Sequence, residues 1–534
     1  MPTESRFLRR LTEGCAAFAR RLRRDERGAI AVQFALLALP LAVLVFGLVD
    51  ISRVSLQRRQ MQDALDAATL IAARSPAVTD VDLDSIGDAA FAAEISGLNL
   101  GLTNSSSTFK AGTDNHILGT ATGTLTPIIA NLWTQQNITI TATSDVVRAS
   151  RNLEVAIVLD ITGSMAGTRL SDLKTGASDL VDIVVKDVQS PFYSKVAIVP
   201  YSVGVNVGSY ADDIRGPVNN YPVSAISKAN GAIVTSNGHG LIVGDQVSFA
   251  GVSGMTMLNG NTYSVTATTT NTFKINANTS SSSKYTSGGV ATCEYSTNPG
   301  CAKFNFPNAN WGNQTLTIGD CVSERTGTNA YTDVAPSTAY VGRNYASNGN
   351  KCPTATITPL SSDRTALKSA INDLEAAGST AGQIGFAWGW YMISPNFGYL
   401  WPNASQRPAA YKAKDLMKVV VLMTDGDFNT PYCKGVIAAD AGSGSGSGND
   451  HINCNATNGD PFTQTKKMCD EMKKSTYGLT IYTVGFTVTS NAAKDMLKYC
   501  ATDSDKVYFP ATGSDLKSSF KSIAQGISNL RIAK

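Results

Sequence analysis

The longest uninterrupted apolar stretch of the sequence lies near its N-terminus. From Gly28 to Val49 the chain carries no charged residue, and a helix of about 20 apolar residues is what a bilayer core requires. The pattern therefore predicts a transmembrane helix over residues 28–50, with Pro40 in mid-span. A cleavable signal peptide is the alternative, but no small-residue cleavage site follows, and helical periodicity continues to about residue 75. We expect an uncleaved anchor.

Positive charge in front of this stretch sets its expected orientation. Residues 1–27 hold eight arginines, and the positive-inside rule keeps such clusters in the cytoplasm. We expect a single-pass protein of the inner (cytoplasmic) membrane, with a basic cytoplasmic tail over residues 1–27 and the bulk of the chain periplasmic or extracellular. The net charge of the whole chain, +3, gives no indication of a nucleic-acid partner.

Beyond the membrane segment the pattern changes twice. Residues 76–150 are rich in Thr and Ser with short β-branched runs, which predicts a β-like stalk region. From residue 151 to residue 534, near-continuous apolar strands such as LEVAIVLD and LMKVVVLMTDG alternate with amphipathic helices. Strands buried on both faces and alternating with helices are typical of a doubly wound, mostly parallel sheet. The predicted fold class of this region is therefore α/β and Rossmann-like.

A polar, β-rich segment over residues 221–351 interrupts this region. Its first half reads as five or six short strands separated by Gly and Asn turns. The sequences HGLIVGDQVSFAGV and LNGNTYSV are similar to a small β module of phage tail proteins and of ubiquitin-activating enzymes. No catalytic cysteine arrangement accompanies them, so we expect a spacer or an additional binding surface and no ubiquitin chemistry.

Oxygen-bearing side chains follow three predicted elements of the sheet region. Asp160 ends one strand, with Thr162 and Ser164 on the loop beyond it, Asp425 ends another strand, and Thr380 precedes a helix. Ligands of open α/β sheets bind at the carboxyl ends of the strands, and carboxylates with hydroxyls suit a hard divalent cation. The alternative is structural: Thr162 or Ser164 caps the next helix, and Asp425 with Gly426 forms a turn.

The set Asp160, Thr162, Ser164, Thr380 and Asp425 resembles the metal-ion-dependent adhesion site of von Willebrand factor A (VWA) domains, in which an acidic residue of the partner completes the coordination of the ion. Thr162 stands where that family has its first serine and keeps the hydroxyl. The resemblance implies Mg²⁺, or another divalent cation such as Mn²⁺ or Ca²⁺. It also implies recognition of a partner and no catalysis, because no base stands nearby to activate water.

A second resemblance covers the N-terminal segment and several later motifs. ERGAIAVQFALLALPLAVLVFGLVDISR followed by MQDALDAATLIAA is similar to TadE/TadG-type proteins of Flp (tight adherence) pilus assembly, as are WGWYMISP, CVSER and CDEMKKSTYGLTIYTVGF. Pilins are cleaved after a glycine that precedes a glutamate by five residues. This chain has Gly28 and Gln33 there, which argues against processing. Core packing is the structural interpretation of Trp388 and Trp390.

Cysteines are unevenly distributed along the chain. Cys15 lies in the basic tail, and eight others lie in the second half: Cys293, Cys301, Cys321, Cys352, Cys433, Cys454, Cys469 and Cys500. An even number on one side of a membrane segment suggests up to four disulfides in an oxidising compartment, with buried free thiols as the alternative. Cys433 with Cys454, around a Gly-Ser linker, and Cys469 with Cys500 are candidate pairs, although connectivity cannot be deduced from sequence.

Three function classes are compatible with these features. The first is an envelope-anchored protein of Flp/Tad pilus assembly or adherence that binds a protein partner through a divalent cation. The second is an adhesin that binds a surface glycan or a host protein directly. The third, an enzyme, is the least favoured, because the three histidines (His116, His239 and His451) occur in no zinc-ligand or nucleophile arrangement.

Overall fold

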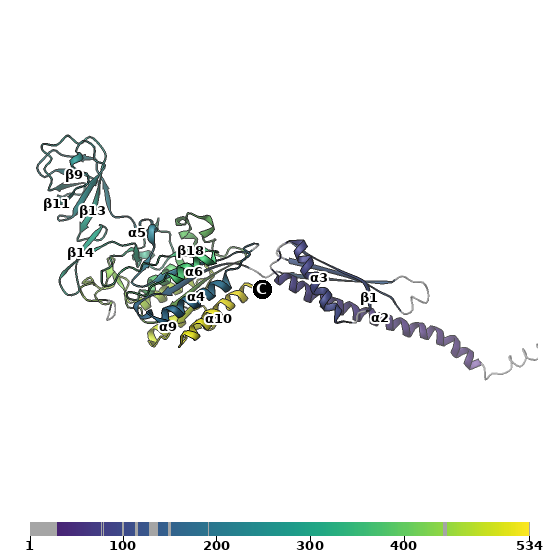
Figure 1. Ribbon diagram of the computed structural model, residues 1–534. Coiled ribbons are helices and arrows are strands. Elements are labelled where there is room, and N and C mark those ends of the chain that lie inside the picture. Colours follow the sequence, from purple (N-terminus) through teal and green to yellow (C-terminus); the bar gives the residue numbers. More distant parts are fainter. Residues whose placement is uncertain are drawn as a thin grey trace, which may run out of the picture. The chain divides into compact units, whose positions relative to one another are not determined.

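A computed structural model describes residues 29–75, 77, 79–98, 101–112, 116–127, 137–147, 151–190, 192–441 and 446–532 (Figure 1). The chain divides into two compact units, residues 1–149 and 150–534. The predicted basic tail and Gly28, the position of the pilin-type cleavage, lie outside the described residues. The mixed α/β character of the chain is confirmed.

The first unit is built around one long helix, α2, which spans Ala29–Arg74. It is the single helix in the described ranges that is long and apolar enough to cross a membrane, and none of its apolar window is buried against protein. Its last third is different, since Met61, Leu65 and Ala68 are fully buried. One continuous helix thus fits a membrane anchor at its start and enters a protein core at its end.

Helix α3 and three antiparallel strands complete this unit. The helix spans Asp80–Ser96, in a region predicted to be β-like, so that prediction is wrong for these residues. Thr79 caps it by accepting a hydrogen bond from the Asp82 backbone N–H, and acidic residues in the first turn favour a helix start. The strands follow in the sheet order β1 (Leu102–Ala111), β2 (His116–Leu125) and β3 (Ile138–Val147).

The two faces of this sheet differ in chemistry. Apolar side chains of the strands, such as Phe109 and Ile117, pack with α2 and α3. Hydroxyl side chains occupy the opposite positions and bond across β1 and β2, with Thr103 paired to Thr124 at 2.8 Å and Thr108 paired to Thr120 at 3.0 Å. The Thr- and Ser-rich composition of the region is therefore the composition of one open sheet face.

The second unit contains a six-stranded sheet with the order β18-β5-β4-β19-β22-β23. The antiparallel neighbours are β18 and β5, and the other neighbouring pairs are parallel. The strands are β4 (Asn152–Asp160), β5 (Ser194–Tyr201), β18 (Thr358–Ser361), β19 (Leu416–Thr424), β22 (Leu479–Gly485) and β23 (Val507–Tyr508).

Helices cover both faces of this sheet (Figure 1). One core contains Val155 and Ile157 of β4 and is closed by α4 (Thr168–Val184), α6 (Arg364–Asn372) and α10 (Gly513–Ile532). The other contains Ala156 and Val158 and is closed by α7 (Gly382–Tyr391), α8 (Pro461–Met472) and α9 (Asn491–Cys500). Alternate residues of one strand thus serve opposite cores, which explains its continuous apolar sequence.

Helix α7 lies unusually close to the sheet. A Cβ added at Gly385 would stand 2.5 Å from the Tyr201 ring, and one at Gly389 would stand 2.5 Å from the Val158 side chain. Trp388 and Trp390 of the same helix are fully buried, which confirms the core-packing interpretation. Small residues toward the sheet and large ones elsewhere therefore fix the position of α7, and with it the loop that carries Thr380.

The interruption of the unit is mainly one nine-stranded sheet. Its strands run from β7 (Asn220–Pro222) to β15 (Asn313–Thr317), with a core of its own around Val247 and Phe273. The residues after it return to the main core, where Val322 and Val341 are buried. The predicted boundary at residue 351 is thus too late for the β module itself.

Four disulfides join the eight cysteines of the described residues. Cys433 bonds to Cys454 and Cys469 to Cys500, so both candidate pairs are present. The remaining pairs are Cys293 with Cys301 and Cys321 with Cys352. The Cys469 bond joins α8 to α9, and the Cys321 bond joins the two ends of the segment that follows the β module.

Candidate metal centre

The carboxylate of Asp160 lies at the carboxyl end of β4 and is fully buried. Its Oδ1 accepts hydrogen bonds from the Thr162 backbone N–H at 3.0 Å and the Thr162 hydroxyl at 2.6 Å. Its Oδ2 accepts from the Tyr201 hydroxyl at 3.0 Å and the Thr424 hydroxyl at 2.9 Å. Four donors, from the two neighbouring strands β5 and β19 and from the loop after β4, therefore hold this carboxylate in a single orientation.

Hydroxyl groups connect Asp160 to the second carboxylate. The oxygens of Thr162 and Ser164 are 3.0 Å apart, and the Ser164 hydroxyl donates to Asp425 Oδ1 at 2.8 Å. Neither side chain caps the following helix, because the N-cap of α4 is Gly167 and no side chain caps it. The oxygens of Asp160, Thr162, Ser164 and Asp425 form one hydrogen-bonded chain.

Thr380 lies on a loop that contacts the Asp160 loop through the backbone. Gly163 N–H donates to the Gly378 carbonyl and Ala377 N–H donates to the Ile161 carbonyl, both at 2.9 Å. Thr380 is buried, and its N–H donates to the Asn429 side chain at 3.0 Å. The structure thus places Thr380 on the neighbouring loop, but the hydrogen-bonded chain of the other four residues does not include it.

The two carboxylates disfavour each other's charge. Burial raises the pKa of Asp160, against the effect of its hydrogen bonds from Thr162, Thr424 and Tyr201. Burial and the charge of Asp160 raise the pKa of Asp425 to about 6. Arg169 opposes this shift, because its Nη1 lies 3.2 Å from Asp425 Oδ2. A cation between the carboxylates would relieve the repulsion from Asp160 that contributes to the raised pKa of Asp425.

The donor chemistry of this cluster suits a hard divalent cation. It offers carboxylate and hydroxyl oxygens, which Mg²⁺ and Ca²⁺ prefer. Over the described ranges no group of three or more His, Cys, Asp and Glu side chains is placed to hold a metal, so hydroxyls would have to supply part of any coordination. Sequence reasoning missed Tyr201, Thr424 and Arg169. The one available signal was the position of Thr424 directly before Asp425.

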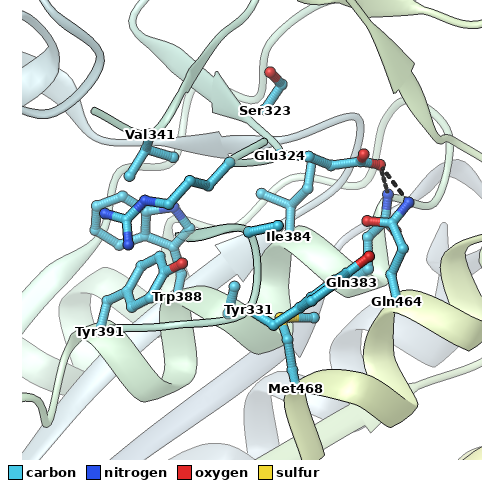
Figure 2. A pocket seen from close by; sticks show the side chains of 13 residues that line it. Ser323, Glu324, Tyr331, Val341, Gln383, Ile384, Trp388, Tyr391, Gln464 and Met468 are labelled. Atoms are coloured by element: carbon cyan, nitrogen blue, oxygen red, sulfur yellow. Dashed lines mark hydrogen bonds between the residues drawn. The ribbon is translucent and has the colours of Figure 1, made fainter. Parts of the chain in front are cut away.

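A second polar cluster contains Ser323, Glu324 and Arg325 of the CVSER motif, and Figure 2 shows Glu324 beside Gln383 and Gln464. Glu324 is buried, and its Oε1 accepts hydrogen bonds from the Gln383 and Gln464 side-chain amides at 2.9 and 3.0 Å. Burial raises the pKa of Glu324 to about 7. Gln383 also donates to the Thr430 carbonyl at 2.9 Å, next to the Asn429 that binds Thr380.

This cluster lines a small, partly open pocket of about 20 Å³, which is room for about one water molecule. Three buried polar atoms of its lining make no hydrogen bond within the described part of the chain: Trp388 Nε1, Gln383 Oε1 and Arg325 Nε. Arg325 is otherwise bound, since its two Nη atoms donate to the carbonyls of Thr332 and Val334. The pocket has the size and polarity of a water site.

Two segments of the chain match known protein families. Residues 28–75 match the family described as Flp pilus-assembly TadE/G-like. Residues 230–294, within the β module, match the family described as ubiquitin-activating enzyme E1 FCCH domain. The N-terminal segment is therefore similar to this pilus-assembly family, and the β module is similar to one domain of ubiquitin-activating enzymes. No curated protein matches the chain.

Among solved structures, similar chains include pilus proteins. The vWF domain of the type V pili tip protein Mfa5 from Porphyromonas gingivalis is 12% identical over 72% of this chain and 97% of its own, with a TM-score of 0.32. The pilus adhesin SpaC from Lactobacillus rhamnosus GG is 12% identical over 79% of this chain and 34% of its own, with a TM-score of 0.31. At these scores the partners of those proteins say nothing about this one.

Proposed function

We propose that this protein is a membrane-anchored component of Flp/Tad pilus assembly or adherence, and that its second unit is a VWA-type domain that binds a protein partner through a divalent cation. The observation that carries the proposal is the chain of oxygens from Asp160 through Thr162 and Ser164 to Asp425. Mg²⁺ is the proposed ion, with Mn²⁺ or Ca²⁺ as substitutes. The family match of residues 28–75 supports the pilus context.

In this proposal each residue of the cluster has a defined task. Asp160 is held rigidly by its four donors and provides a fixed anion. Ser164 and Asp425 face it from the other end of the oxygen chain, and Thr380 stands on the adjacent loop. When bound, the cation supplies an electrophilic site that an acidic side chain of the partner completes. Arg169, partly exposed beside Asp425, would attract the same acidic group.

We also propose a localisation, which the apolar helix and the disulfides support. We place the N-terminus in the cytoplasm, the α2 segment in the inner membrane and the rest of the chain outside the cytoplasm. Four disulfides support an oxidising compartment. We propose a binding protein and no enzyme.

Metal binding and partner capture can be tested together on the full-length protein in lipid nanodiscs. Mn²⁺ is titrated and the free ion is measured by electron paramagnetic resonance, and envelope proteins are captured with Mg²⁺ or with EDTA. We expect one bound Mn²⁺ and EDTA-sensitive capture, both lost in Asp160→Ala. The matched control is Asp179→Ala, an exposed acid of α4, which should retain both. Wild-type binding and capture that persist in Asp160→Ala would contradict the proposal.

The pilus context has a separate test. A strain that lacks the protein should show fewer surface pili, and the wild-type gene should restore them while the Asp160→Ala gene does not. Normal pili in the deletion strain would remove the protein from pilus assembly and would leave the metal site to be judged by the titration.

A further inference from the structure

Trp311 is the one solvent-exposed tryptophan among the described residues. It is 83% exposed, whereas Trp388, Trp390 and Trp401 are at most 1% exposed. Trp311 lies in the loop between β14 (Lys303–Pro307) and β15. Tryptophan combines a large apolar ring with a polar N–H group and is enriched at binding interfaces. The exposed ring is therefore a candidate contact for a ligand.

The backbone at Trp311 is held in a conformation that bulky residues rarely adopt. Its φ is 67°, in the left-handed region where non-glycine residues carry a strain cost. The buried Asn308 side chain fixes the loop, because its Oδ1 accepts from Asn310 N–H at 3.0 Å and Gly312 N–H at 2.9 Å. Strain that is over-determined by surrounding hydrogen bonds is typical of functional positions.

A second loop braces the first. Ala309 N–H donates to the carbonyls of Gly448 and His451 at 3.1 and 3.0 Å, and the Asn310 side chain donates to Asn449 Oδ1 at 3.1 Å. The second loop belongs to the segment closed by the Cys433–Cys454 disulfide.

The base of the hairpin packs on the same disulfide-closed segment. Phe304 and Phe306 of β14 share a buried cluster with Val436, Ala438 and Ile452. Trp311 is thus held in one position before any ligand binds. Binding to its ring would therefore cost the chain little conformational entropy.

The surroundings of the ring identify the ligand class. No charged residue occurs from Phe304 to Gly319, and the exposed polar side chains of the two loops in the described residues include the amides Asn310, Asn313 and Asn449. The acid of the second loop, Asp450, is half-buried and accepts a hydrogen bond from the Ser447 hydroxyl. An aromatic face packs against the apolar C–H face of a sugar ring, and amides pair with its hydroxyl groups as both donors and acceptors. We propose that the Trp311 loop binds a neutral oligosaccharide, independently of the metal centre.

The test uses the full-length protein in nanodiscs with four neutral probes: N-acetylchitotriose, cellotriose, maltotriose and lacto-N-tetraose. Binding is followed by tryptophan fluorescence and by isothermal titration calorimetry. At least one probe should bind, with a loss of tenfold or more in affinity for Trp311→Asn and less than threefold for Trp311→Phe. Asparagine tolerates the positive φ, so the melting temperature of Trp311→Asn should match that of the wild type.

Two controls separate this inference from the proposed metal function. Tyr499→Ala removes an exposed ring of α9 and should leave sugar binding unchanged, as should EDTA or Asp160→Ala. Failure of all four probes to bind, or equal binding by Trp311→Asn, would overturn the inference. Loss of captured envelope protein in Trp311→Asn without any sugar binding would overturn it as well, because Trp311 would then be a protein contact.

Discussion

The Ser164 hydroxyl donates a 2.8 Å hydrogen bond to Asp425, across a sequence separation of 261 residues. The bond exists because β4 and β19 are neighbouring parallel strands, so the loops that follow them emerge at the same edge of the sheet. The separation includes the entire β module, and the insertion therefore leaves the geometry of this edge intact.

A bound divalent cation should stabilise the second unit. With Mg²⁺ at about 100 times its dissociation constant, the free energy of unfolding should rise by about 3 kcal/mol, because the unfolded chain does not assemble the oxygen cluster. Differential scanning calorimetry with and without Mg²⁺ measures the shift in melting temperature. Asp160→Ala should abolish the shift and Asp179→Ala should preserve it; an equal shift in both variants would mean that the ion acts elsewhere.

Removal of the Arg169 guanidinium should strengthen cation binding. The Arg169 side chain is 42% exposed and pairs with Asp425, so it competes with the ion for that carboxylate. Exposed ion pairs contribute about 1 kcal/mol or less, which limits the expected gain for Arg169→Gln to about fivefold in affinity. Mn²⁺ titration measures it. Arg364→Gln, which breaks the distant pair with Asp187, serves as the control, and weaker binding by Arg169→Gln would show that Arg169 supports the site.

Lys418 of β19 and Glu154 of β4 form an ion pair in which both side chains are at most 2% exposed. Lys418→Met would leave the Glu154 charge buried without its cation, although Tyr193 and the Ala409 N–H would still donate to it. The expected loss in unfolding free energy is about 3–5 kcal/mol, measured by chemical denaturation. Lys418→Met combined with Glu154→Gln should recover part of it, and a double variant as unstable as the single one would contradict this account.

Stability should depend on pH through Glu324. Its pKa is about 7 in the folded protein against an ordinary value of 4.5, so the folded state binds the proton more tightly than the unfolded state. The protonated Glu324 therefore contributes about 3 kcal/mol to the free energy of unfolding below about pH 4.5, and this contribution is lost as pH rises towards 7. Melting temperatures from pH 4.5 to 8 should show a flatter profile for Glu324→Gln. Glu375→Gln, at an exposed acid, should keep the wild-type slope.

The sheet region was largely predictable because its strands are buried on both faces and so have apolar sequences without interruption. Helix α3 was not predicted, because its alanines and aspartates lie within a region whose overall composition is rich in threonine. The helix-capping residue Thr79 was a local signal for the helix start, but the composition of the region favoured strands. The end of the β module was missed for a similar reason. The residues after Thr317 are polar, yet Val322 and Val341 return to the main core.

The candidate site was partly predictable from strand ends. Asp160 and Asp425 each end an apolar strand, a position visible in the sequence. Tyr201 and Arg169 could not be identified, because a tyrosine at the end of a strand or an arginine on a helix has no local pattern, and their roles come from the pairing of β4 with β5 and from the direction of α4. Trp311 could not be identified either, since its exposure depends on the fold of a hairpin.

Helix α2 runs from the membrane-compatible segment to Met61 and beyond without a break or linker. Because a helix rises about 1.5 Å per residue, the buried residues near its end lie at a fixed distance from the apolar segment. Any rotation of the helix about its axis turns the folded first unit by the same angle. If α2 is the anchor of the proposed function, a protein that binds and rotates its apolar segment would rotate the folded first unit as well.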